Sequence, residues 1–103
     1  MDNGVQTAFI AVQNLLTEDA VVYFDRIDGV LTIIDYEDKP ALKIDYKEAM
    51  KKFFEMMLTD RILVRYTRFK NEKAFLSKLT MVNDYIKSGD YIAVMGCKEC
   101  QVI

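Results

Sequence analysis

The chain has 103 residues, of which 51% are hydrophobic, and a formal net charge of -2. This length fits one compact domain with its own core, and we expect residues 1–103 to form a single domain. The sequence has no histidine, which excludes Ser-His and Cys-His nucleophile chemistry within the chain. No apolar run approaches the roughly 18 residues of a membrane-spanning helix. We therefore expect a soluble, cytoplasmic protein that does not bind membranes.

The first half of the chain predicts one helix followed by strands. In residues 5–16 the apolar side chains recur at helical spacing. Residues 20–27 and 30–36 are rich in β-branched and aromatic residues, which indicates two strands. Both strands are apolar on both faces, so we expect cover on each face.

Asp28-Gly29, between these two strands, predicts a two-residue hairpin. An Asp-Gly pair is typical of a type I′ turn, because both central residues of that turn need positive φ. This turn would place Ile27 opposite Val30.

The segment Tyr46 to Leu58 has a pronounced helical pattern. Asp45 stands at the N-cap position and Glu48 follows three residues later, as in a capping box. The predicted buried stripe consists of Tyr46, Ala49, Met50, Phe53, Phe54, Met57 and Leu58. We expect this helix to cover a sheet, with residues 41–44 upstream as a short third strand.

The second half continues with a strand, a helix and a strand. Residues 61–69 alternate as a strand does, although a continued helix is the competing interpretation. Asn71 can cap a helix that runs to Lys87 and stops at Ser88-Gly89. Its predicted buried side consists of Phe75, Leu76, Leu79, Val82 and Ile86. The tail from Asp90 begins as a strand.

This order, αβββαβαβ, predicts an α+β fold. An antiparallel sheet, a meander around the Asp28-Gly29 hairpin, would pack with about three helices.

Cys97 and Cys100 form a C-x-x-C pair near the end of the sequence. Two thiolates at this spacing can bind one metal ion, but tetrahedral zinc needs two further ligands. A complete site would therefore need zinc shared across a dimer, or acidic residues as the remaining ligands, which is the less common arrangement. A redox pair normally begins a helix, and three residues after Cys100 are too few to form one. We favour the third interpretation, that both are ordinary packing cysteines.

Residues 61–73 interleave basic and aromatic side chains, as surfaces that bind single-stranded nucleic acid do. The basic members are Arg61, Arg65, Arg68, Lys70 and Lys73. In a strand, Arg65 and Arg68 would lie on opposite faces, which divides the patch. The negative net charge also argues against nucleic-acid binding.

The acidic residues concentrate in the first half of the sequence: residues 1–50 carry ten acidic and four basic residues, and residues 51–103 carry six and ten. Asp25 and Asp35 would lie on different faces of the hairpin, so no paired-carboxylate acid–base site is implied. We expect a partner-binding surface that includes Asp25, Asp35, Glu37, Asp38 and Met56.

These features favour a small interaction protein of a regulatory or inhibitor type over an enzyme. Ile10, Met56 and Met81 lie off the apolar stripes of their helices. Excess apolar surface of this kind points to a protein partner, most simply a second copy in a homodimer. The first alternative is a metal- or thiol-dependent module that uses Cys97 and Cys100. The second is single-stranded nucleic-acid binding.

Overall fold

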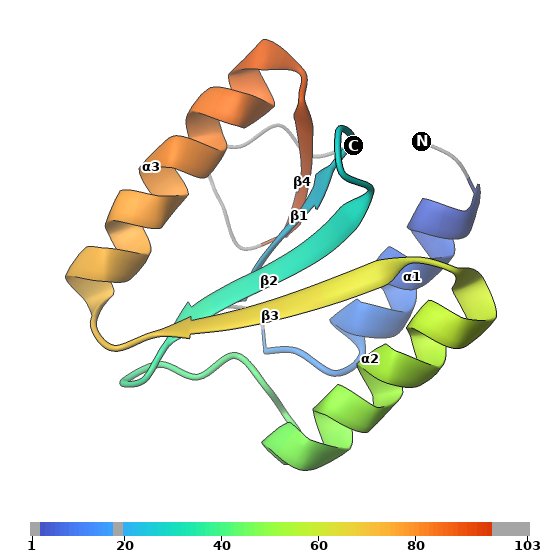
Figure 1. Ribbon diagram of the computed structural model, residues 1–103. Coiled ribbons are helices and arrows are strands. Elements are labelled where there is room, and N and C mark those ends of the chain that lie inside the picture. Colours follow the sequence, from blue (N-terminus) through green and yellow to red (C-terminus); the bar gives the residue numbers. More distant parts are fainter. Residues whose placement is uncertain (1–2, 18–19, 96–103) are drawn as a thin grey trace.

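The computed structural model describes residues 3–17 and 20–95, and these residues form three helices and a four-stranded sheet (Figure 1). The elements are α1 (Asn3–Gln13), β1 (Val21–Asp25), β2 (Val30–Tyr36), α2 (Tyr46–Asp60), β3 (Leu63–Phe69), α3 (Glu72–Ser88) and β4 (Tyr91–Met95). The predicted α+β class is confirmed, as is the choice of a strand for the segment after α2.

The sheet is mixed, with the strand order β3-β2-β1-β4. Strand β1 is antiparallel to β2 and β4, whereas β2 and β3 are parallel. The prediction of a purely antiparallel sheet is therefore wrong. Helix α2 connects β2 to β3, and a helical crossover brings the next strand back in the same direction.

The third strand predicted at residues 41–44 is also wrong. This segment passes between β2 and α2 as a connection, in which Leu42 makes an isolated bridge to Leu16. Ala41 is buried against the core formed with α1 and α2. The observed order is therefore αββαβαβ.

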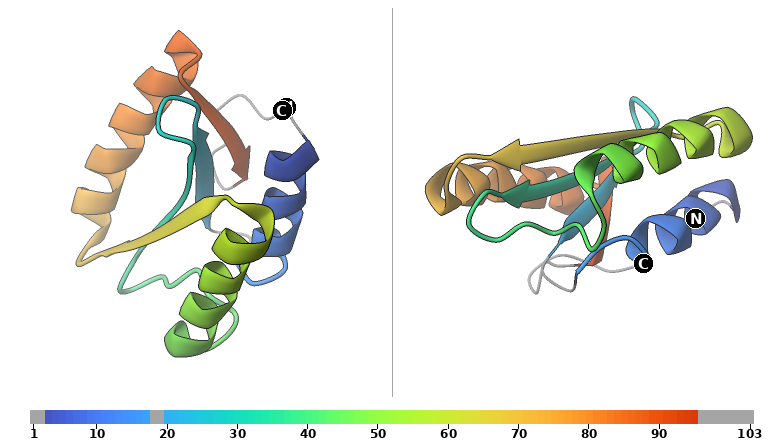
Figure 2. Two further views of the ribbon diagram at one scale, coloured as in Figure 1. Left: turned by 45° about the vertical axis from the view of Figure 1, so that its right-hand side comes forward. Right: turned by 90° about the horizontal axis from the view of Figure 1, so that it is seen from below.

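Helices cover both faces of the sheet, with α1 and α2 on one face and α3 on the other (Figures 1 and 2). On the first face, Phe9 of α1 and Phe53 of α2 pack with Ile33 of β2. On the second face, Phe75 of α3 packs with Ile34 of β2. Neighbouring residues of one strand thus enter different cores, which explains why the hairpin sequence is apolar on both faces.

The β1–β2 hairpin is two residues out of its predicted register. Asp25 lies opposite Val30, where the two-residue turn would place Ile27. Residues 26–29 form a longer turn, in which Gly29 alone has positive φ (71°). The Asp25 carboxylate accepts a hydrogen bond from the Ile27 amide (2.8 Å) and so stabilises this turn. A shift of two residues leaves every side chain on its predicted face.

The predicted caps of α2 and α3 are confirmed. The Asp45 carboxylate accepts from the Lys47 amide (3.1 Å), and the Asn71 side chain accepts from the Ala74 amide (2.9 Å). Gly89 ends α3 with φ 87°, a conformation that glycine adopts without a steric penalty.

The buried faces of the helices differ in part from the predicted stripes. Helix α2 buries Ala49 and Phe53, whereas Phe54 and Leu58 are 57% and 64% exposed. On α3, Leu76 is exposed as well. None of the helices in the described part of the chain is long and apolar enough to cross a bilayer.

The two adjacent phenylalanines of α2 give a direct test of its orientation. We expect Phe53→Ala to lower the free energy of unfolding by about 3–5 kcal/mol, because it opens a cavity in the core. Phe54→Ala should cost less than about 1 kcal/mol, since its side chain lies mainly in solvent. Urea unfolding at low protein concentration compares the two, and equal losses would contradict the observed face.

Candidate functional site

The outer side of α2 carries apolar side chains that the protein does not bury. Tyr46, Phe54 and Leu58 are 53%, 57% and 64% exposed, and they follow one another at multiples of four residues along one flank. At the N-terminal end of β3, Leu63 is 45% exposed, but it shares a face with Phe69 and therefore lies on the α3 side of the sheet. The Tyr46 ring contacts the Tyr66 ring of β3 edge to face, with centroids 5.9 Å apart. Tyr46, at the start of α2, therefore adjoins β3.

Strand β3 is an edge strand, with β2 on one side and no strand of the described chain on the other. It contains seven residues, Leu63–Phe69. An edge strand presents unpaired N–H and C=O groups that can pair with a strand of another chain. We define the α2–β3 surface as Tyr46, Phe54 and Leu58 of α2 together with this unpaired edge.

A buried carboxylate fixes β3 in place. Asp35 on β2 is 2% exposed, and Arg68 lies directly beside it on β3. Arg68 binds it with two hydrogen bonds, from Nε to Oδ1 (3.0 Å) and from Nη2 to Oδ2 (2.9 Å). The Tyr66 hydroxyl and the Ala41 amide (2.7 Å) also donate to Oδ2. Such full pairing is what makes a buried charge tolerable.

Arg68 also contacts Tyr66. Its Nη2 donates to the Tyr66 hydroxyl (2.6 Å), and its guanidinium lies 5.5 Å from the centre of the Tyr66 ring. Burial and the hydrogen bond to the Asp35 carboxylate raise the pKa of Tyr66 above its ordinary 10.0. The hydrogen bond to Asp35 likewise raises the pKa of Arg68, so the guanidinium stays charged. We call Asp35, Tyr66 and Arg68 the Asp35 network.

One feature of the sequence indicates this network, although hydrophobic periodicity alone does not reveal it. Asp35 is the one charged residue in the β2 sequence, and a lone charge within an apolar strand usually has a partner. Tyr66 and Arg68 stand two residues apart on one face of β3. Their joint approach to Asp35 depends on the parallel β2–β3 pairing, which we had not predicted.

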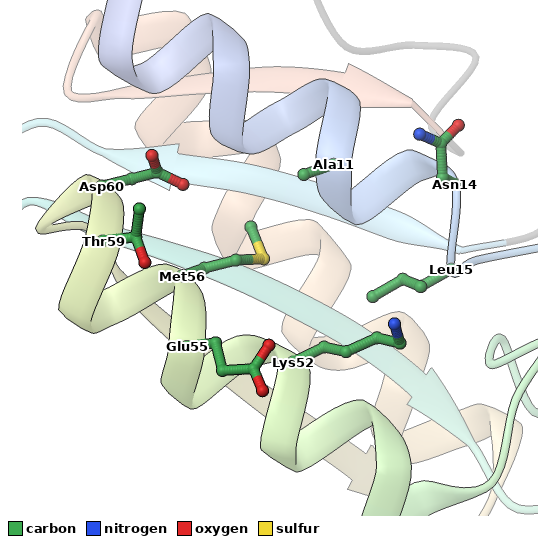
Figure 3. A pocket seen from close by; sticks show the side chains of 8 residues that line it. All are labelled: Ala11, Asn14, Leu15, Lys52, Glu55, Met56, Thr59 and Asp60. Carbon is green, nitrogen blue, oxygen red and sulfur yellow. The ribbon is translucent and has the colours of Figure 1, made fainter.

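A groove of about 410 Å³ separates α1 from α2 (Figure 3). Ala11 and Leu15 on one side and Met56 on the other form its apolar part, while Lys52 and Asp60 contribute charges of opposite sign. Met56 points from α2 towards α1 and packs against the core. Met56, predicted to lie off the apolar stripe of its helix, is thus partly buried all the same, because α1 covers this side of α2.

Two of the four acidic residues predicted for a partner-binding surface, Asp25 and Asp35, are buried. Asp25 and Asp35 are 9% and 2% exposed and accept hydrogen bonds from the protein itself, so neither forms a surface patch. Their predicted placement on different faces of the sheet is correct. Glu37 and Asp38, in the turn after β2, are exposed.

The basic residues do not form one patch on β3. Arg65 and Arg68 lie on opposite faces of the strand, as alternation predicted, and Arg68 is bound to Asp35. Arg61, Lys70 and Lys73 are exposed, with Arg61 at the C-terminal end of α2 and both lysines at the start of α3. Nucleic-acid binding by these residues stays a prediction.

Cys97 and Cys100 lie outside the described residues, so the zinc and redox hypotheses stay predictions. Within residues 3–17 and 20–95, no three histidine, cysteine, aspartate or glutamate side chains are grouped so that they could hold a metal ion.

No protein-family model matches the chain, and searches of curated proteins and of solved structures found no significant match. What the protein binds must therefore be inferred from its own surfaces.

Arg68 can be compared with Arg65, its neighbour on the other face of β3. We expect Arg68→Met to lower the free energy of unfolding by about 3 kcal/mol, because the buried Asp35 carboxylate loses its charged partner. Arg65→Met should cost less than about 1 kcal/mol, as exposed substitutions usually do. Similar losses in thermal or urea unfolding would show that the Asp35 network does not stabilise the fold.

The raised pKa of Tyr66 predicts how stability depends on pH. Below about pH 10, tyrosine is protonated in both the folded and unfolded states, and the contribution of Tyr66 is fully present. Above that pH the unfolded chain loses the proton first, so this contribution declines. We therefore expect the difference in unfolding free energy between wild type and Tyr66→Phe to shrink above pH 10. Urea titrations from pH 7 to pH 11 measure it, and a constant difference would be the contrary result.

Proposed function

We propose that this chain is a protein-interaction module that binds its partner through the α2–β3 surface. One observation carries the proposal: α2 exposes apolar side chains, two of them aromatic, and its Tyr46 contacts Tyr66 on the unpaired edge strand β3. Isolated apolar residues are common on protein surfaces, but a grouping beside an open edge is typical of an interface.

The expected mode of binding is the addition of a partner strand to β3. Backbone hydrogen bonds along the edge would supply affinity, and the side chains of α2 would select the partner. Tyr46 and Phe54 are suited to this role, because aromatic residues bury large areas and dominate interface energies.

The Asp35 network supports the proposal by fixing the strand that binds. It holds β3 to β2 through two side chains and to the connection before α2 through the Ala41 amide. A strand held in its binding conformation loses little conformational entropy when a partner binds. We place the protein with regulatory or inhibitor-type proteins, which act by occupying the surface of another macromolecule.

A photo-reactive amino acid at position 58 tests the surface. We expect it to yield a discrete covalent adduct when cells that express the full chain are irradiated, since Leu58 would lie in the interface. The matched control is position 81, because Met81 is similarly exposed (51%) but lies on α3, across the sheet. Equal labelling at both positions, or none at position 58, would count against the proposal. The mass of the adduct then identifies the partner.

A further inference from the structure

We infer that the partner of the α2–β3 surface is a second copy of this chain, which pairs with β3 in one antiparallel register centred on Tyr66. The inference rests on the proposed function and names the occupant of the same surface. It follows from which backbone groups of β3 face outward.

One hydrogen bond determines the direction of these groups. The Glu37 amide donates to the Phe69 carbonyl (2.9 Å), so the backbone groups of Phe69 face β2. In a parallel pair of strands, the backbone N–H and C=O groups of every second residue form hydrogen bonds with the neighbouring strand, and those of the residues between them face the other way. Leu63, Arg65, Thr67 and Phe69 therefore face β2, whereas Val64, Tyr66 and Arg68 face outward.

An antiparallel partner forms its hydrogen bonds with these three outward-facing residues. When a twofold axis passes through Tyr66, this residue lies opposite its own copy, and Val64 lies opposite the partner's Arg68. All three residues are then paired. If the axis is moved by one residue in either direction along the strand, Arg68 or Val64 no longer has a hydrogen-bonded partner in the other strand. The register centred on Tyr66 is thus the one that satisfies the whole edge.

The same register brings compatible side chains together. On the α3 face, Leu63 lies opposite the partner's Phe69, and Arg65 lies opposite the partner's Thr67. A register centred on Arg65 would set two arginines directly opposite each other, which is destabilising. The Arg68 charge is already compensated within each chain by Asp35.

Helix α2 completes the interface. A twofold axis through the β3 pair runs perpendicular to the sheet, so both copies of α2 lie on the same face of a continuous eight-stranded sheet. The exposed Phe54 and Leu58 of both copies then lie on this one face of the joined sheet. An isologous contact of this kind covers the same apolar residues on both chains, which explains why each chain leaves them exposed.

Amide hydrogen exchange of the wild-type chain tests the register by NMR. We expect the amides of Val64, Tyr66 and Arg68 to exchange about tenfold or more slowly at high protein concentration than after dilution. The amides of Arg65 and Thr67 are internal controls, because β2 protects them at both concentrations. Fast exchange of the three outward amides at the highest soluble concentration would overturn the inference.

Disulfide cross-linking gives a second readout in chains in which Cys97 and Cys100 are changed to serine. Arg65→Cys and Thr67→Cys should form a disulfide when the two variants are mixed, since opposed residues of a non-hydrogen-bonded pair lie within the required distance. Neither variant alone should form one. No disulfide in the mixture, or one in Arg65→Cys alone, would overturn the register. An adduct of position 58 with a different protein would refute self-pairing and leave the proposed function intact.

Discussion

The structure depends on one buried carboxylate. Asp35 receives hydrogen bonds from Tyr66 and Arg68 of β3 and from Ala41, in the connection that leads to α2. It therefore fixes both the parallel β2–β3 pair and the entry to the helix above it. A charge in this position is costly unless every partner is present, so the contacts specify one arrangement of β2, β3 and α2 together.

That arrangement produces the surface to which we assign the function. Because α2 connects two parallel strands, it lies along β3 at the edge of the sheet (Figure 1). Its inner side covers the core through Phe53, while Phe54 on its outer side is exposed. The fold thus places an apolar helix flank beside open backbone groups, a combination suited to recognition by strand addition.

Local patterns predicted the elements well and their assembly less well. Asp45, Asn71 and Gly89 marked helix ends correctly, because capping depends on neighbouring residues. The parallel pairing was missed because it is decided by where α2 packs, which periodicity does not reveal. The hairpin register was missed because the Asp25 side chain stabilises a longer turn.

Of the predicted partner residues, the structure buries Asp25 and Asp35, and sequence pattern does not distinguish a buried paired acid from a surface acid. The exposed flank of α2 was missed because its apolar stripe is wider than its contact with the core.

The central claim is that the α2–β3 surface joins two copies of the chain, and sedimentation equilibrium of the 103-residue chain tests it most directly. The account predicts a concentration-dependent mass that approaches twice the 12.0 kDa of one chain. It also predicts that the double variant Phe54→Ser/Leu58→Ser sediments as a monomer, whereas Met81→Ser behaves as the wild type. A wild-type chain that sediments as a monomer at every concentration would contradict the account.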